Sequence, residues 1–307
     1  MVEYVGRLAP SPTGALHLGN VRTFMIAWLR ARQAAGRLIL RIEDLDHPRH
    51  KPGAEAQAIT DLRWLGFDWD EEFVQSERRG LYAAALARLR AQGLAYPCAC
   101  SRRDVETAQS APHAGDQLHY PGTCRGRFVS WAEAASAAGR TPCWRFRTPE
   151  GARVAFEDGF AGRYEMDVAA TLGDFPLARD EDGGGYAIAV TVDDASMGVT
   201  EVVRGDDLLP ATPQQLLLYR ALGLTPPSFF HVPLVVGPDG RRLAKRHGDT
   251  RIASFRAAGM RPEAVIGFLA HASGILPDKK PIGLKSLIGL FDPVRLPRGP
   301  LVFQGFT

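Results

Sequence analysis

The 307-residue sequence predicts an α/β protein built around a doubly wound parallel sheet. Strand-like and helix-like segments alternate through residues 1–95 and again through residues 186–245, which is the pattern of a parallel sheet covered by helices. Between these halves, residues 96–185 are rich in Gly, Pro and charge, with short alternating runs, and indicate an inserted α+β module. Residues 246–307 return to a helical pattern and predict a small helical appendix.

The first half should contain two strands and three helices. Residues 2–8 have β-branched and aromatic content, and Leu38–Ile42 is a short apolar run typical of a buried parallel strand. Apolar residues at three- and four-residue spacing predict a helix from Leu18 and two further helices around Ile59–Leu65 and Leu81–Leu89. Each helix should end at a glycine, namely Gly36, Gly66 and Gly93.

The second half should alternate in the same way. The apolar, β-branched runs Ile188–Val192 and Thr200–Val203 indicate a return to sheet strands. A helix is expected over Pro213–Leu222, since a proline stands at its start and a glycine follows its end. Val232–Val236 predicts the last strand, and the helical pattern resumes after Ile252.

Composition places the chain among ordinary globular proteins. Hydrophobic residues make up 45% and charged residues 23%, and neither a spanning apolar run nor a secretory leader is evident. We therefore expect a cytoplasmic protein without membrane association. The net charge of +3 permits an anionic partner, and six basic residues between Arg241 and Arg251 form a cluster of the kind that attracts phosphate, although a solvated loop would have the same composition.

The segment Ser11–Asn20 indicates a nucleotide site. Its glycines, Gly14 and Gly19, let the backbone turn sharply at the point where a strand should give way to a helix. The N-terminus of that helix favours anions, and His17 can donate to a phosphate oxygen. Lys245, at the centre of the basic loop, can neutralise the charge that develops as pyrophosphate leaves. The pattern predicts electrostatic catalysis without a covalent intermediate on the protein.

Three cysteines indicate a metal site in the insert. Cys98 and Cys100 form a Cys-x-Cys pair and Cys124 follows, so three thiolates can occupy three corners of a tetrahedral zinc site. The spacing leaves the fourth ligand open among three residues, His113, His119 and Tyr120. Cys143 has no partner in this pattern and is interpreted as a core residue.

These motifs together resemble the glutamyl/glutaminyl branch of class I aminoacyl-tRNA synthetases. The resemblance covers roughly residues 4–275 and rests on five segments: Pro10–Asn20, Arg41–Asp46, Tyr186–Asp194, Val202–Leu208 and Leu243–Lys245. It implies that the sheet is the Rossmann-type catalytic core of that class. The last segment departs from the family pattern, because Arg242 replaces the usual lysine and Ala244 the usual serine. Ala187 also stands where the branch often has Asn.

The resemblance implies sites for ATP and for L-glutamate. The catalytic residues would be His17 and Lys245, and ATP would contact Pro12, Gly14, His17, Gly19, Asn20 and Lys245. Arg7 would bind the γ-carboxylate of glutamate, for which a planar guanidinium is well suited, and Glu43 would bind its α-ammonium. The remaining glutamate-binding residues would be Leu8, Ala9, Pro10, Ser11, Tyr186 and Arg204. Mg²⁺ should accompany ATP, held mainly by the phosphates and water.

A narrower resemblance is to the short glutamyl-queuosine tRNA(Asp) synthetases. In that family a tyrosine oxygen completes the zinc site, which implies that Tyr120 joins Cys98, Cys100 and Cys124 around one structural zinc ion. The sequence also stops before the anticodon-binding domain that a tRNA-charging glutamyl enzyme normally carries. The resemblance implies that the anticodon arm of tRNA(Asp) enters the active site, that glutamate is attached to queuosine there, and that the enzyme is a monomer. The insert would be an acceptor-type module and the appendix would resemble a stem-contact domain.

Two other hypotheses remain at this point. One is a compact glutamyl-tRNA synthetase that charges the 3′ end of a tRNA. The other is a non-catalytic RNA-binding module derived from a synthetase, for which the altered residues Arg242 and Ala244 are the only support.

Overall fold

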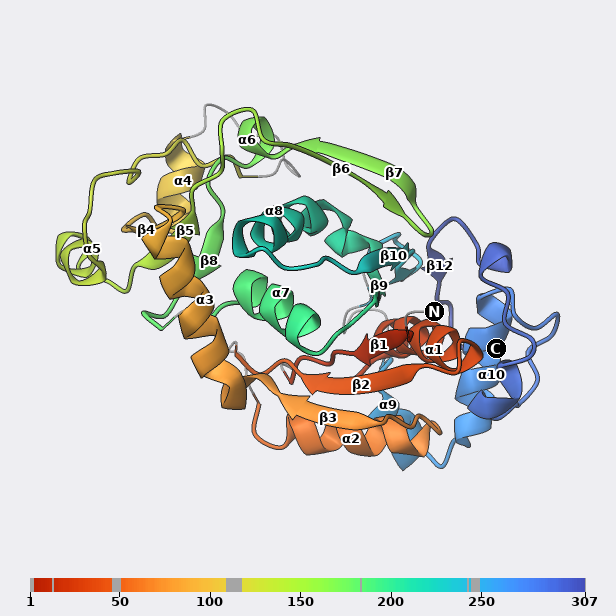
Figure 1. Ribbon diagram of the computed structural model, residues 1–307. Coiled ribbons are helices and arrows are strands. Elements are labelled where there is room, and N and C mark those ends of the chain that lie inside the picture. The colour runs from red at the N-terminus through yellow and green to blue at the C-terminus, as the bar shows by residue number, and fades with distance from the viewer. Residues whose placement is uncertain are drawn as a thin grey trace.

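The computed structural model describes residues 3–12, 14–45, 51–108, 118–182, 184–241, 243 and 249–306. Its centre is a parallel sheet in two halves (Figure 1). In the first half, β1 (Val5–Leu8), β2 (Arg37–Ile42) and β3 (Glu71–Val74) pair in parallel in that order. In the second half, β9 (Glu201–Gly205) and β10 (Ser228–Val232) also pair in parallel.

The two halves meet between β1 and the start of β9. The Thr200 amide donates to the Val5 carbonyl at 2.9 Å, and the Val5 amide donates to Thr200 Oγ1 at 2.9 Å. Strands β2 and β3 therefore lie on one side of this junction, beyond β1, and β10 lies on the other side, beyond β9. Such a junction is the point at which doubly wound sheets bind ligands, beyond the carboxyl ends of the strands.

Helices cover the sheet as the alternation predicts. They are α1 (Leu18–Gln33), α2 (Ala54–Trp64), α3 (Arg79–Ala91), α7 (Tyr186–Ser196) and α8 (Thr212–Leu222), with short 3-10 turns η2 (Gln75–Arg78) and η3 (Asp206–Ala211). The buried side chains of α1 pack between the two halves, against both β1 and β9. The predicted helices after Leu18 and over Pro213–Leu222 are confirmed.

The prediction of a strand at Ile188–Val192 is wrong, because this run lies in helix α7. All five of its side chains are buried or nearly so, as α7 packs against α3, α8 and the strand β8 (Pro176–Ala178). A helix buried on every side has no polar face, so it lacks the 3.6-residue period that would distinguish it from a strand.

The predicted strand Val232–Val236 is also displaced. Strand β10 ends at Val232, and a separate short strand, β11 (Val235–Val236), follows Pro233. Proline has no amide hydrogen and interrupts a ladder, which accounts for the break. Strand β11 pairs in parallel with β12 (Leu301–Val302), so the C-terminal segment forms a separate two-stranded sheet with it.

The insert contributes a sheet of its own and extends the central one. Strands β4 (Ala95–Cys98), β5 (Cys143–Phe146) and β8 form an antiparallel sheet, accompanied by α4 (Arg102–Ala108), α5 (Trp131–Ala138) and α6 (Val168–Thr171). The hairpin of β6 (Arg153–Asp158) and β7 (Gly162–Asp167) leaves this module and pairs with β10 at Asp158. The boundaries of the four predicted domains stay a prediction.

The appendix lies at the end of the molecule opposite the antiparallel sheet of the insert (Figure 1). The tip of the β6–β7 hairpin reaches it, and Arg298 of the appendix donates to the Phe160 carbonyl there. It comprises α9 (Ile252–Ala257), α10 (Pro262–Ala272), η5 (Leu284–Leu287), η6 (Pro293–Arg295) and strand β12. Its apolar side chains join the same core as α1 and β2. Among the described residues, no helix has the length and apolar character needed to cross a membrane.

Gly36 should be essential to the pairing of β1 with β2. A Cβ at this position would lie 2.3 Å from the Tyr4 carbonyl oxygen, which accepts the Arg37 amide at the start of the β1–β2 ladder. We expect Gly36→Ala to lower the free energy of unfolding by about 1–3 kcal/mol, as overpacking does.

The matched control is Gly80→Ala, because Gly80 lies in α3 with nothing within 4 Å of its added Cβ. This variant should be neutral or more stable by up to about 1 kcal/mol. Urea denaturation of both variants measures the difference, and equal midpoints would contradict the role given to Gly36.

Candidate functional site

A pocket of about 250 Å³ opens at the junction between the two halves of the sheet. Its walls come from the β1–α1 connection, the end of β2, the start of α7, the β9–η3 connection and the segment after β10. The lining residues are Arg7, Ala9, Ser11, His17, Gly19, Asn20, Thr23, Phe24, Glu43, Tyr186, Val203, Arg204, Gly205, Asp207, Leu208, Leu234 and Val235.

Arg7 contributes a buried cation to the wall. Its side chain is 6% exposed, its Nη1 donates to the Val203 carbonyl at 2.8 Å, and its Nε lies 3.8 Å from Asp194 Oδ1. Burial lowers the pKa of Arg7, and Asp194 partly offsets that effect. Within the described part of the chain, the Nε atom has no hydrogen-bond partner. A buried N–H without an acceptor is costly, so the site favours an anionic ligand here.

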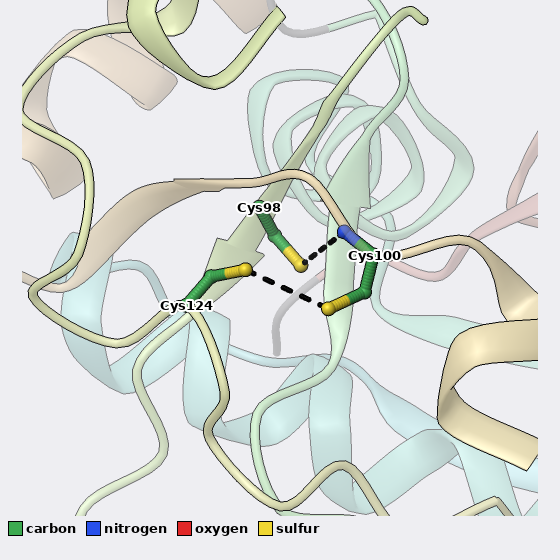
Figure 2. A group of neighbouring side chains, drawn as sticks. All are labelled: Cys98, Cys100 and Cys124. Atoms are coloured by element: carbon green, nitrogen blue, oxygen red, sulfur yellow. Dashed lines mark hydrogen bonds between the residues drawn. The ribbon is translucent and has the colours of Figure 1, made fainter. Parts of the chain in front are cut away.

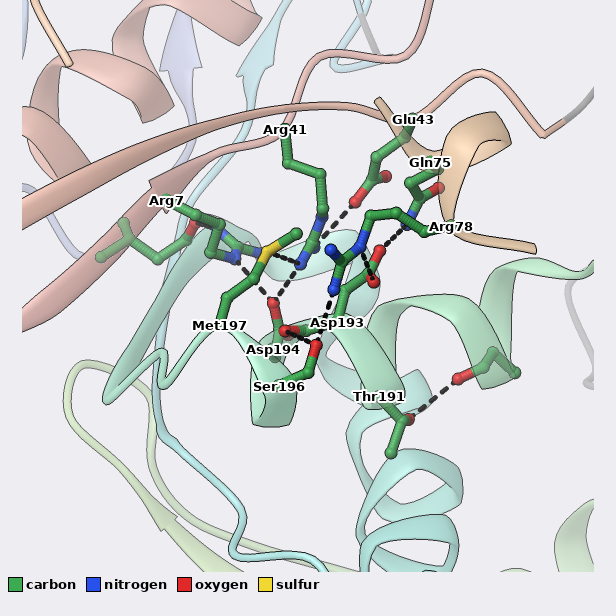
Figure 3. Close-up of polar contacts among 12 residues, drawn as sticks. Arg7, Arg41, Glu43, Gln75, Arg78, Thr191, Asp193, Asp194, Ser196 and Met197 are labelled. Carbon is green, nitrogen blue, oxygen red and sulfur yellow. Dashed lines mark hydrogen bonds and ion pairs between the residues drawn. The ribbon is translucent and has the colours of Figure 1, made fainter. Parts of the chain in front are cut away.

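Glu43 faces the same pocket and is held by Arg41. The fully buried Arg41 donates to Glu43 Oε1 at 2.9 Å and to Asp194 Oδ1 at 2.6 Å, so that one guanidinium joins two carboxylates (Figure 3). Burial raises the pKa of Glu43, while the positive charge of Arg41 acts against that rise. The pairing favours the carboxylate form of Glu43, which can accept hydrogen bonds from an ammonium group.

Arg204 is fixed by a different set of partners. Its Nε donates to His231 Nε2 at 2.9 Å and one Nη donates to Thr212 Oγ1 at 2.8 Å. Like Arg7, it keeps one buried nitrogen, Nη1, without a partner among the described residues. Arg7 and Arg204, on neighbouring strands, therefore line one pocket, and each keeps one buried nitrogen without a described partner.

His17 occupies the N-cap of α1, where the chain turns from the pocket into the helix. Its Nδ1 accepts the Gly19 amide at 3.1 Å, and its own amide donates to Asn20 Oδ1 at 3.1 Å, which completes a capping box. Because Nδ1 accepts a hydrogen bond, the proton of the neutral ring is on Nε2. The ring can therefore donate through Nε2 to an anion near the helix N-terminus.

Most sequence-predicted residues of the two substrate sites line this pocket. Arg7, Ala9, Ser11, Glu43, Tyr186 and Arg204 of the glutamate set do so, as do His17, Gly19 and Asn20 of the ATP set. Leu8 is buried in the core instead. The backbone carbonyls of Pro10 and Pro12 accept hydrogen bonds from the amides of Glu43 and Lys51, respectively.

The two glycines predicted at the nucleotide site, Gly14 and Gly19, differ in their surroundings. Gly14 has neither a left-handed φ nor a neighbour that a Cβ would touch, so the structure gives no steric reason for a glycine there. Gly19 does have one, since a Cβ would lie 3.0 Å from the His17 ring. Five of the residues considered from the sequence lie outside the described part of the chain: Asp46, His113, Arg242, Ala244 and Lys245.

Sequence reasoning missed several residues that shape the pocket. Arg41 and Asp194 belong to recognised motifs, but their roles depend on side chains 153 positions apart that meet only in the fold. Thr23 and Phe24 lie on the first turns of α1, and Leu234 and Val235 follow β10. A hydrophobic pattern assigns such residues to a core, and nothing in it shows that they also face a ligand.

The three cysteines of the insert lie together. The Sγ atoms of Cys98, Cys100 and Cys124 lie within 4.8 Å of one another, and Figure 2 shows the three thiols converging. Tyr120 brings its hydroxyl to the same point, 3.3 Å from Cys98 Sγ and 3.9 Å from Cys100 Sγ. His119 is not part of this group. Three thiols and one oxygen provide the number and softness of ligands that zinc requires, so the cluster could hold that metal.

The surroundings of Cys98 favour its thiolate, whereas burial raises the pKa of Cys100 to about 12. A hydrogen bond with Cys143, on the facing strand, is the largest cause that lowers the pKa of Cys98, to about 4, and Tyr120 and Arg145 act in the same direction. The Arg145 Nε–H donates to Cys98 Sγ at 3.2 Å, and its guanidinium lies 3.8 Å from the centre of the Tyr120 ring.

Comparison with protein families identifies the family to which this fold belongs. Residues 3–281 match the family described as tRNA synthetases class I (E and Q), catalytic domain, where E and Q stand for glutamate and glutamine. The chain belongs to this family of class I tRNA synthetases. The family's catalytic domain thus includes both halves of the sheet, the insert and most of the appendix.

Relatives within the E and Q synthetases carry two different names. The chain is 51% identical to a glutamyl-Q tRNA(Asp) synthetase of Symbiobacterium thermophilum, covering 96% of this chain and 94% of that one. It is 42% identical to glutamate–tRNA ligase 1 of Halorhodospira halophila, covering 97% of this chain but 64% of that one. A solved glutamate tRNA ligase from Elizabethkingia meningosepticum, in complex with its amino acid, superposes with a TM-score of 0.82 at 28% identity, over 98% of this chain and 67% of that one.

Asp194 should be the most sensitive charge at this site. It is 2% exposed and balances Arg41 directly and Arg7 at longer range. Asp194→Asn would leave two buried guanidinium groups with only Glu43 between them, so we expect the free energy of unfolding to fall by about 3–5 kcal/mol.

The control is Glu106→Gln, which removes the carboxylate of an exposed pair with Arg102 and should cost about 0.5 kcal/mol or less. Guanidinium denaturation compares the two variants. A loss below 1 kcal/mol in Asp194→Asn would show that the pocket does not depend on this carboxylate.

Proposed function

We propose that the protein activates L-glutamate with ATP and transfers it to the queuosine base of tRNA(Asp). The observation that carries this proposal is the similarity to relatives named glutamyl-Q tRNA(Asp) synthetase, at 46–51% identity over nearly the full length of both chains in the first four. The relatives named glutamate–tRNA ligase match at 40–42% identity and over 63–64% of their own length.

The arrangement of charges supports glutamate as the amino acid. We assign Arg7 to the γ-carboxylate, because its unpartnered Nε–H lies in the pocket wall, and Glu43 to the α-ammonium. Tyr186 and Arg204 complete the wall, and the connection from Leu8 through Ala9, Pro10 and Ser11 supplies backbone groups beside them. Glutamine would place an amide N–H₂ where the site offers only donors, and it is rejected for that reason.

ATP would lie against the N-terminus of α1. His17, Gly19 and Asn20 surround that end of the helix, and we place Pro12, Gly14 and Lys245 in the same site by the family motif. An oxygen of the glutamate α-carboxylate attacks the α-phosphorus of ATP and pyrophosphate leaves. The His17 Nε2–H and the Lys245 ammonium would stabilise the negative charge that develops on the phosphates. Mg²⁺ accompanies ATP and neutralises part of the same charge.

In the second step, a hydroxyl of the queuosine cyclopentene ring attacks the glutamyl carbonyl. The carbonyl–oxygen bond to AMP breaks, AMP leaves and an ester forms on the base. The anticodon arm of tRNA(Asp) would have to reach the pocket for this step. We expect the enzyme to act as a cytoplasmic monomer.

The test follows labelled glutamate to its final position. Purified protein, ATP and labelled L-glutamate are incubated with tRNA(Asp) that contains queuosine and, as the control, with tRNA(Asp) from cells that lack it. We expect label only in the first RNA, and nuclease mapping should place it in the anticodon-loop fragment.

Other outcomes select among the alternatives. Label at the 3′-terminal adenosine of both RNAs would instead show a compact charging enzyme. If glutamate fails to support exchange of pyrophosphate into ATP, the non-catalytic reading holds and the proposal is wrong.

We further propose that Cys98, Cys100, Tyr120 and Cys124 hold one structural zinc ion that stabilises the insert. The convergence of three Sγ atoms and the Tyr120 hydroxyl supports this ligand set. The Cys124 amide donates to the Tyr120 oxygen at 2.8 Å and orients it toward the thiols.

Cys98→Ser should reduce zinc from about one per chain to a small fraction, because a neutral hydroxyl replaces a thiolate ligand. Cys143→Ser is the matched control, since Cys143 lies opposite Cys98 in the β4–β5 pair but outside the ligand set, and it should retain the metal. Elemental analysis of both purified variants measures the result. Equal zinc contents would refute the assignment.

A further inference from the structure

Two residues that do not line the pocket hold Arg204 in place: His231 contacts it directly, and Asp158 contacts His231. His231, on β10, is fully buried, and its Nε2 accepts the Nε–H of Arg204 at 2.9 Å. On the other side of the ring, His231 Nδ1 lies 2.6 Å from Asp158 Oδ2, at the end of strand β6. A line of hydrogen bonds therefore leads from the β6–β7 hairpin of the insert to the wall of the pocket.

The direction of these bonds determines the tautomer of His231. Arginine has no acceptor, so Nε2 must offer its lone pair, and the single proton of the neutral ring must be on Nδ1, where Asp158 accepts it. Burial lowers the pKa of His231, and the nearby Arg204 acts in the same direction, against the hydrogen bond to Asp158. The ring is therefore neutral and can keep both bonds at once.

Asp158 is suited to impose this tautomer. Its Oδ1 accepts three backbone amides, from Phe160 at 2.9 Å, Ala161 at 2.8 Å and His231 at 3.1 Å, so only Oδ2 faces the ring. Burial works to raise the pKa of Asp158, but the hydrogen bonds from His231 and these amides outweigh it and lower the pKa. The group is thus a carboxylate, which can only accept.

We propose that Asp158 and His231 are positioning residues for Arg204. Together with Thr212, they fix the rotation of its guanidinium at the wall of the pocket in which the amino acid substrate would bind. This inference rests on the proposed function, since it names the residues that set the affinity of that pocket for glutamate. It also gives the insert a part in amino acid binding, because Asp158 comes from the insert and Arg204 from the central sheet.

Asp158→Asn tests the relay with a nearly isosteric change. The amide oxygen should keep the three backbone N–H donors, which leaves the N–H₂ group facing His231 Nδ1. The ring proton must then move to Nε2, where it opposes the Nε–H of Arg204 and removes that hydrogen bond. We expect the KM for glutamate in ATP–pyrophosphate exchange to rise about ten- to hundredfold, with the KM for ATP changed less than about twofold.

Two substitutions of His231 provide the matched comparison. In His231→Gln, the amide oxygen reaches the position of Nε2 and can still accept from Arg204. In His231→Asn, the amide reaches only the position of Nδ1 and can bond to Asp158 but not to Arg204. We expect the asparagine variant to lose more glutamate affinity than the glutamine variant, whatever the order of their thermal stabilities.

The tautomer itself can be measured in ¹⁵N-histidine-labelled protein. His231, assigned by its disappearance in His231→Gln, should show a proton on Nδ1 in the wild type and on Nε2 in Asp158→Asn. An unchanged KM for glutamate in Asp158→Asn, or equal increases in the KM for glutamate and for ATP, would overturn the relay while leaving the proposed function intact. A wild-type enzyme that shows no glutamate-dependent exchange would overturn the proposed function itself.

Discussion

The burial of arginine side chains at the junction of the two half-sheets is the constraint on which the rest of this structure depends. Arg7, Arg41 and Arg204 are each 6% exposed or less, and a guanidinium removed from water must find acceptors. Arg41 is paired with two carboxylates, yet Arg7, Arg41 and Arg204 each keep one nitrogen without a partner in the described structure. Of these three arginines, Arg7 and Arg204 line the pocket, so their positive charge is available to an anionic ligand there.

The fold is arranged to bring those acceptors and donors together. Strands β1 and β9 lie side by side through Thr200, which puts Arg7 and Arg204 on adjacent strands near their carboxyl ends. Helix α7 carries Asp194, and it is anchored by Asp193, which accepts hydrogen bonds from Gln75 and Arg78 (Figure 3). Asp193 also accepts a hydrogen bond from the Tyr82 hydroxyl. Two consecutive aspartates thus serve different purposes: Asp193 fixes the helix, and Asp194 compensates the arginines of the pocket.

The sequence predicted the sheet, its helices and most of the pocket because the relevant signals are local. Amphipathic spacing located α1, a proline and a glycine marked the ends of α8, and a motif of eleven residues located the β1–α1 connection. Two kinds of feature could not be predicted in this way. Helix α7 is buried on all sides, so its apolar run has no period and resembles a strand. His231, which accepts a hydrogen bond from Arg204, and Asp158, which bonds to His231, come from β10 and β6, 73 positions apart in the chain, and no short-range pattern relates them.

If Arg7 and Arg204 bind glutamate as proposed, the distinction between glutamate and its neutral analogue follows from the same hydrogen-bond requirement. A carboxylate has two oxygens and only accepts, so it would offer acceptors to both guanidinium groups whichever way it rotates. The amide of glutamine replaces one of those oxygens by an N–H₂ group, and a buried donor that meets another donor loses its hydrogen bond and its desolvation free energy together. Discrimination of this kind requires that the guanidinium groups cannot rotate to avoid the mismatch. Val203 and Asp194 immobilise Arg7, and His231 and Thr212 immobilise Arg204. In the proposed function, these interactions would therefore contribute to substrate selection as much as the nitrogens that would contact the substrate.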